Sequence, residues 1–181
     1  MSAAGGRFAP GEKLFLASAG VVQVQGYAAQ GDRGSPAPLR PGDAPAFYVV
    51  AGDDVTACVP LDQAERTLRP LVDRSTAERM LQVLREPSPP PPATSEPLLE
   101  RGKRVVHSGT PLDHAWFLRE LYGLPLPLTE PIAQGIQFFT GLVLGEVAEV
   151  TGAPRADLER EMRGRYPAAA GLATAVRFRP D

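Results

Sequence analysis

The chain has 181 residues, of which 43% are hydrophobic, and a formal net charge of -2. This length holds one ordinary domain or two small ones, and the composition is that of a folded protein rather than a disordered one. The charge balance excludes a strongly basic domain that binds nucleic acid non-specifically, and the single cysteine, Cys58, excludes an internal disulfide or a multi-cysteine zinc site.

No apolar run reaches the roughly 18 residues that a membrane helix needs. The closest run, residues 136–150, is interrupted by glutamine, threonine, glycine and two glutamates. The first residues contain no apolar segment that resembles a signal peptide. We therefore expect a cytoplasmic protein with no membrane partner.

The first third of the chain has the pattern of short β-strands. We expect strands at residues 13–16 and 21–27, followed by a mobile loop over residues 28–45, which are rich in glycine and proline. Residues 47–50 and 55–59 are β-branched, aromatic or small and flank Gly-Asp-Asp, which predicts a hairpin. Because a hairpin alone is marginally stable, these strands together predict a small β-barrel with open edges.

A helix with clear boundary signals follows the strands. Ser75 and Glu78 have the spacing of a capping box, and the apolar residues Ala77, Met80, Leu81 and Leu84 then recur at helical spacing. We expect this helix to cover the open end of the barrel. Residues 87–92 read Pro-Ser-Pro-Pro-Pro-Pro, which favours a stiff polyproline II linker over an SH3-type ligand in this context.

The remaining residues predict helices. They are expected over 98–107, from a cap at Thr110 to Gly123, from about 130 to Gly152, and from 154 to about 163. Trp116, four residues after Leu112, is expected in the core by that spacing. The predicted fold is therefore α+β, with domains at 7–86 (β-barrel with its covering helix) and 98–166 (helical), joined by the linker 87–97 and followed by a poorly ordered tail, 167–181.

Several segments in this order resemble one bacterial family. RFAPGEKLFLASAGVVQV, FYVV, DVTACVPLDQAERTLRPLV and MLQVLREP in the first half, and HSGTP, AWFLRELY and LVLGEVAEVTG in the second, are similar to the CarD/CdnL transcription regulators. The first half is also similar to the polymerase-interacting domain of transcription-repair coupling factors. The likeness spans most of residues 7–165, and its specificity comes from the order of many weak matches.

The resemblance implies a non-catalytic transcription regulator without a cofactor. In the family, an N-terminal Tudor-like barrel binds the β subunit of RNA polymerase, and the helical domain contacts promoter DNA at the upstream edge of the bubble. The matched positions for polymerase binding are those of the second hairpin strand: Val55, Thr56, Ala57, Cys58 and Pro60. The resemblance also implies a cytoplasmic, nucleoid-associated protein.

This sequence departs from the family pattern at three places. A tryptophan wedge usually follows the linker, whereas residues 93–98 contain no aromatic side chain. The start of the long helix, residues 130–140, lacks the family's lysines and arginines. Cys58 stands where relatives often have arginine, so an ion pair at that point is lost, whereas backbone pairing with a partner strand would survive.

One basic group remains at the position of the family's first basic helix. It comprises Arg101, Lys103, Arg104 and His107, which we predict as the DNA-binding residues, although a solvated surface cluster would look the same. The alternative function is an adapter that binds polymerase or another protein and has lost DNA binding. No nucleophile, base and orienting group occur together and no catalytic motif is present, so we expect neither an enzyme nor a small-molecule substrate.

Overall fold

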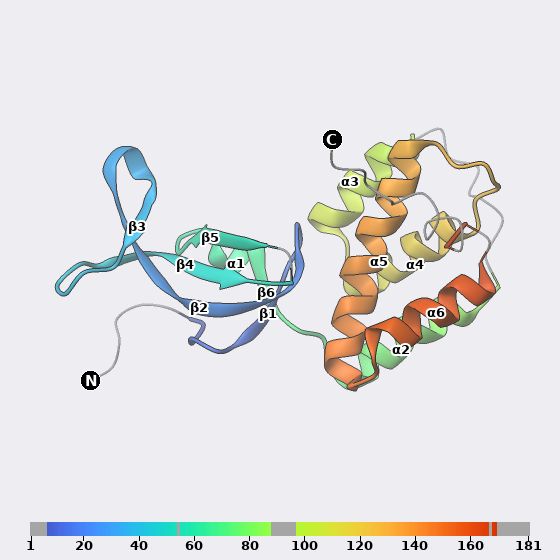
Figure 1. Ribbon diagram of the computed structural model, residues 1–181, viewed down its shortest axis with the longest axis horizontal. Helices are drawn as coiled ribbons and strands as arrows, with labels where there is room; N and C mark the ends of the chain where they lie inside the picture. Colours follow the sequence, from blue (N-terminus) through green and yellow to red (C-terminus); the bar gives the residue numbers. More distant parts are fainter. Residues whose placement is uncertain (1–6, 54, 88–96, 167, 170–181) are drawn as a thin grey trace, which may run out of the picture. The chain divides into compact units, whose positions relative to one another are not determined.

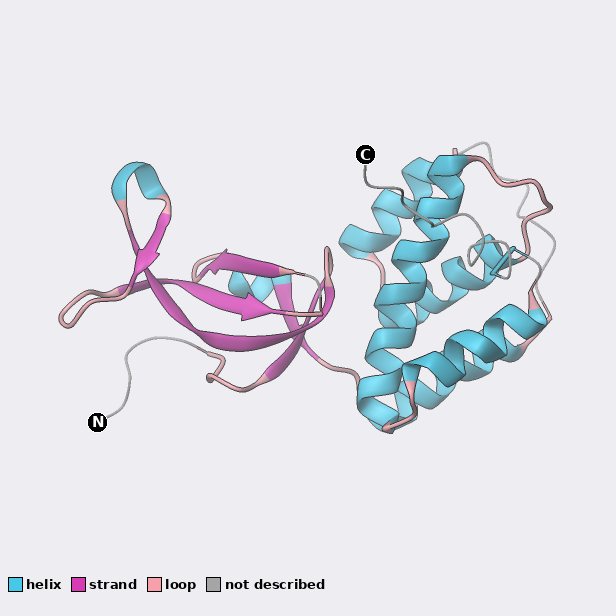
Figure 2. Cartoon of the chain, viewed as in Figure 1, coloured by secondary structure: helices cyan, strands magenta, loops and turns pink. Residues whose placement is uncertain are grey.

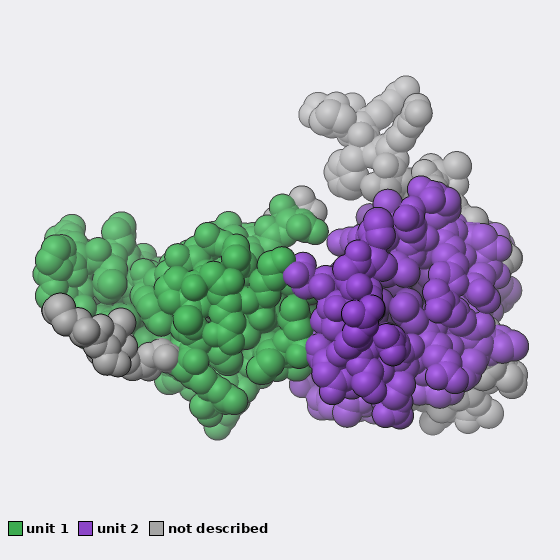
Figure 3. Space-filling model, turned by 90° about the horizontal axis from the view of Figure 1, so that it is seen from below, with its two compact units in different colours: residues 1–71 green, residues 72–181 purple. Residues whose placement is uncertain are grey.

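The computed structural model describes residues 7–53, 55–87, 97–166 and 168–169. The chain folds into two compact units, residues 1–71 and residues 72–181, which Figure 3 shows in different colours. Unit 1 contains an antiparallel sheet, and unit 2 contains helices (Figure 2). The α+β class expected from the sequence is therefore confirmed.

The described residues of unit 1 form six strands in one open antiparallel sheet, which Figure 1 shows. The strand order is β5-β4-β2-β1-β6, and β3 pairs with the far end of β2. The elements are β1 (Lys13–Leu16), β2 (Gly20–Gln30), the short 3-10 helix η1 (Asp32–Gly34), β3 (Pro36–Pro38), β4 (Pro45–Ala51), β5 (Thr56–Pro60), α1 (Ala64–Thr67) and β6 (Leu68–Pro70).

The core of unit 1 follows from alternation along these strands. Every second side chain of β4, and of β2 as far as the irregularity after Val24, points inward. The buried cluster includes Leu14, Leu16, Val22, Val24, Tyr48, Val50 and Val59. Tyr48 lies at its centre, and its hydroxyl oxygen accepts from the backbone N–H of Phe8 at 3.0 Å. This contact attaches the segment before β1 to the sheet.

The segment 28–45 differs from the expected loop. Strand β2 continues to Gln30, and β3 pairs with it through the register Ala29↔Ala37. The backbone N–H of Gly31 donates to the carbonyl of Ser35 at 2.7 Å, so by antiparallel alternation Ala29 and Ala37 form the next hydrogen-bonded pair. The backbone nitrogens of the two prolines in β3 then point away from β2, so their lack of an N–H removes no hydrogen bond to that strand. A proline-rich strand is compatible with that edge position.

The described part of unit 2 contains five helices: α2 (Arg74–Arg85), α3 (Leu98–Ser108), α4 (Pro111–Tyr122), α5 (Glu130–Thr151) and α6 (Arg155–Arg165). The prediction that the first of these covers the barrel is wrong, because its apolar face packs in the core of unit 2. Ala77, Met80 and Leu84 of α2 are fully buried in the same cluster as residues of α4 and α5. The helix needs the same apolar face to pack against the sheet or against other helices, so the sequence pattern does not show which of the two cores it joins.

The N-terminal cap of α2 also differs from the prediction. Asp73, not Ser75, caps the helix, and its carboxylate accepts from the backbone N–H of Thr76 at 2.6 Å. This hydrogen bond lowers the pKa of Asp73. Both Asp and Ser are good capping residues, so a two-residue shift of the boundary was within the ambiguity of the local signal.

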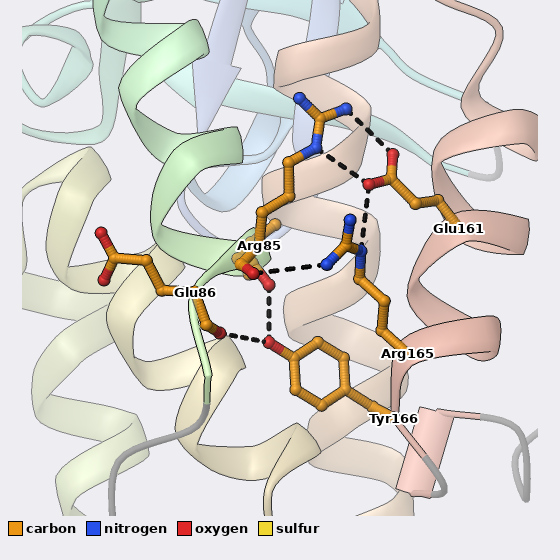
Figure 4. A network of polar contacts seen from close by, with 6 residues as sticks. Arg85, Glu86, Glu161, Arg165 and Tyr166 are labelled. Atoms are coloured by element: carbon orange, nitrogen blue, oxygen red, sulfur yellow. Dashed lines mark hydrogen bonds and ion pairs between the residues drawn. The ribbon is translucent and has the colours of Figure 1, made fainter.

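The C-terminus of α2 is held by side chains from two other helices. No glycine closes this helix, and its last carbonyls lack intrahelical donors. The Tyr166 hydroxyl donates to the carbonyls of Leu84 (2.6 Å) and Glu86 (2.9 Å), and the Arg165 guanidinium donates to that of Arg85 at 3.3 Å (Figure 4). Arg119 of α4 donates to the carbonyl of Val83 at 3.1 Å. These donors fix the end of α2 within unit 2.

Three other helix boundaries match the sequence signals. Thr110 and Asp113 form a capping box at the start of α4. The Thr110 hydroxyl also donates a hydrogen bond to the Asp113 carboxylate, and this bond lowers the pKa of Asp113. Gly123 follows the last residue of α4. Gly152 ends α5 in the left-handed conformation, with φ of 75°.

The proline-rich linker and the tail lie largely outside the described residues, which lack 88–96, 167 and 170–181. The linker was expected to separate two domains. Because α2 and α3 belong to the same unit, the segment between them instead connects two helices of unit 2. In the described part of the chain, no helix combines the length and apolar character required to cross a membrane.

Candidate functional site

Strand β5 forms one end of the sheet in unit 1, since β4 is its neighbour on one side and no described strand pairs with the other. Two hydrogen bonds fix the ladder between β4 and β5: Gly52 N–H to the Val55 carbonyl (2.8 Å) and Leu61 N–H to the Ala46 carbonyl (2.9 Å). Hydrogen-bonded pairs alternate along an antiparallel ladder, so Ala57 and Val59 also bond to β4. The backbone groups of Thr56, Cys58 and Pro60 therefore point to the open edge.

The side chains of β5 follow the same alternation. Ala57 is half-buried and Val59 is buried against the core, whereas Thr56 and Cys58 are exposed. Val55 precedes the strand and packs against the core. The Cys58 side chain therefore lies on the solvent face of the strand.

The five positions suggested for polymerase contact thus divide into two groups. Thr56, Cys58 and Pro60 offer backbone groups at the edge, with two N–H donors and three carbonyl acceptors, because proline lacks the donor. The side chains of Val55 and Ala57 pack against the hydrophobic core of unit 1. An extended segment of a partner could pair with the first group and extend the sheet.

The basic group of unit 2 is less available than its sequence suggests. Arg101 forms an ion pair with Glu120 of α4, its side chain is only 12% exposed, and its guanidinium lies 5.5 Å from the centre of the Phe117 ring. Lys103 pairs with Glu100 at 2.7 Å on the surface. Lys103, Arg104 and His107 are exposed on α3. Arg101 thus joins α3 to α4, and little of its side chain is exposed at the surface.

Trp116 is an exposed aromatic residue that the sequence pattern places in the core. We expected it in the core, but it is 45% exposed on α4. The guanidinium of Arg119 lies 4.2 Å from the centre of its ring, and Glu86 holds that guanidinium at 2.7 Å. The sequence contained one indication of this contact, since Trp116 and Arg119 are three residues apart and so lie on the same face of a helix. A flat ring held in this way offers a surface for stacking or for packing against a partner.

No cluster of three or more histidine, cysteine or acidic residues that could hold a metal occurs among the described residues. His114 is buried, and its Nε2 lies 3.0 Å from the Val105 carbonyl, so it is part of the packing between α3 and α4. His107 is exposed on α3.

The chain matches no protein-family model and no curated protein sequence.

Proposed function

We propose that this protein is a non-catalytic bacterial transcription regulator of the CarD/CdnL type, which binds the β subunit of RNA polymerase through unit 1. In this proposal the open sheet corresponds to the family's Tudor-like barrel, and the protein acts in the cytoplasm, at the nucleoid. The observation that carries the proposal is the open edge of β5, which occupies the same residues as the polymerase-contacting strand implied by the sequence resemblance.

The mode of binding is addition of a strand from the polymerase to β5. Backbone groups of Thr56 and Cys58 supply donors and acceptors at this edge, and Pro60 supplies an acceptor. Each such hydrogen bond contributes about 1 kcal/mol net. This mode requires no charge at position 58, which accounts for how cysteine can replace the arginine often found in relatives.

The test compares two substitutions at position 58 in the full chain. Cys58→Pro removes an N–H that faces the open edge and leaves the bonds to β4 in place, whereas Cys58→Ser changes the side chain and keeps the N–H. Binding to a fragment of the polymerase β subunit should weaken about 10-fold or more for Cys58→Pro, because one bond is lost and the ring obstructs the incoming strand. Cys58→Ser should bind as the original chain does. Equal affinity of all three would contradict strand addition, and no binding by the original chain would contradict the proposed partner.

Contact with promoter DNA is the second part of the proposal. It would rest on Lys103, Arg104 and His107, which are exposed on α3. Arg101 would contribute only by holding α3 against α4. A gel shift with the full chain at several salt concentrations tests this. Arg104→Gln should reduce the salt slope by about one phosphate contact, whereas Arg160→Gln, which removes an exposed arginine of α6, should not.

The adapter that has lost DNA binding is favoured by a different observation. Trp116 and Phe138 are large, exposed apolar side chains of unit 2. An aromatic side chain that is rigid and half-exposed is typical of an energetically important protein contact. DNA affinity that is absent at low salt, with polymerase binding intact, would select this alternative.

A further inference from the structure

Unit 2 contains an apolar pocket between helices α3, α4 and α5. Its volume is about 330 Å³. The floor consists of Phe117 and Phe139, whose rings pack edge to face with centres 4.8 Å apart. Leu99, 51% exposed, and Phe138, 37% exposed, lie at its margin. A space of this size lies at the lower end of the range of small-molecule sites.

Two glycines give the pocket its form. A Cβ on Gly102 of α3 would come within 3.2 Å of the Phe117 ring, so glycine at this position lets α3 lie close to α4. A Cβ on Gly135 of α5 would meet no atom within 4 Å. Gly135 lines the pocket, and a side chain at this position would meet open space.

The polar groups of the pocket all come from α3. They are Glu100, Lys103 and His107. Lys103 and His107 are one helical turn apart and so lie on the same face of α3. Lys103 pairs with Glu100 at 2.7 Å, but both side chains are more than half exposed, at 67% and 58%. An exposed ion pair of this kind contributes little to stability, so Lys103 can exchange Glu100 for another anion at a low cost in free energy.

We propose that this pocket binds an amphipathic small molecule with an apolar chain and an anionic head group. The chain would lie on Phe117 and Phe139 beside Gly135, and the head group would accept hydrogen bonds from the Lys103 ammonium and the His107 imidazole. The proposal does not depend on polymerase binding through unit 1, but it shares Lys103 and His107 with the DNA contact proposed above.

The test is a titration of the full chain with three compounds of equal chain length, followed by the backbone amide signals of Gly102 and Gly135 in NMR spectra. Octanoate should give saturable shifts at both amides, octanol should bind about five-fold more weakly, and octylammonium more weakly still. Equal binding of octanoate and octylammonium, or no saturable shift, would overturn the proposal.

Two glycine variants locate the binding site. Gly135→Leu places a side chain in the pocket and should abolish saturable octanoate binding while the chain stays folded, since leucine is the better helix former. Gly164→Leu is the matched control, because Gly164 is also helical and open around its Cβ position but lies on α6, away from the pocket. Octanoate binding should be unchanged in this control. Undiminished binding to Gly135→Leu would show that the ligand lies elsewhere.

A third variant tests the head-group contact without filling the pocket. Lys103→Gln should weaken octanoate binding about five-fold and leave octanol binding unchanged. This readout remains informative if Gly135→Leu does not fold. A Lys103→Gln variant that binds octanoate as tightly as the original chain would exclude the proposed contact.

Discussion

Replacing Tyr166 by phenylalanine should destabilise unit 2 although the aromatic packing is retained. The hydroxyl donates to the carbonyls of Leu84 at 2.6 Å and Glu86 at 2.9 Å, at the end of α2 (Figure 4). The phenylalanine ring can still stack on Tyr122, where the ring centres are 5.3 Å apart. Only the donor is removed, and a buried carbonyl without its donor costs about 2 kcal/mol.

The assay is thermal and urea unfolding followed by the fluorescence of Trp116, which is the single tryptophan and reports on unit 2. For a domain near this size, about 2 kcal/mol corresponds to a decrease of about 8 °C in Tm. Ser108→Ala is the control, because it removes a hydroxyl that donates to the Arg104 carbonyl at 2.9 Å on the surface. It should change stability by less than about 0.5 kcal/mol. A Tyr166→Phe effect as small as that would refute the view that these side-chain donors hold the end of α2.

Three further predictions concern the ends of the helices and their acidic groups. Thr110→Ala should lower the free energy of unfolding in urea by about 1 kcal/mol, because it removes the side chain that caps α4. An unchanged urea midpoint would contradict the capping role of Thr110. Gly152→Ala should also lower the free energy of unfolding by about 1 kcal/mol, because φ at this residue is 75°, a conformation that alanine disfavours. The added Cβ would meet no atom, so the loss comes from the backbone alone. Gly164→Ala, within α6, should instead raise the free energy of unfolding. Hydrogen bonds from Arg85 to Glu161 and from Thr110 to Asp113 lower both carboxyl pKa values, so their stabilisation is present above the unfolded-state pKa of about 4 and is lost as the pH falls through the folded values. Unfolding measured against pH should show this loss, and Glu161→Gln should reduce its slope.

Local signals were sufficient to predict most elements of the chain. Strand β1, the helix cap at Thr110 and the helix end at Gly152 all occur where the sequence places them. Each depends on interactions within a few neighbouring residues, such as capping hydrogen bonds or the conformational freedom of glycine. The proline-rich β3 was missed because its placement depends on which backbone groups face β2, and that is set by pairing with residues before η1.

The candidate sites were predicted less completely because exposure and pairing are tertiary properties. Arg101 belongs to a basic sequence, but Glu120 of another helix pairs with it. Trp116 has the spacing of a core residue, but it lies on the exposed side of α4, under Arg119. The pocket depends on Gly102 and Gly135, which are far apart in the sequence and have no pattern that links them.

The sequence by itself determined the class of the fold, the hairpin of β4 and β5, and several helix boundaries of unit 2, namely the cap at Thr110 and the ends near Gly123 and Gly152. These features follow from residue periodicity and from hydrogen bonds between near neighbours. Only the tertiary structure decided that α2 packs with α4 and α5, and that the backbone of β5 faces an open edge at Cys58. An apolar helix face fits any apolar core of suitable shape, and a strand is the same locally at an edge or in the middle of a sheet, so both choices are made by the partners that surround them.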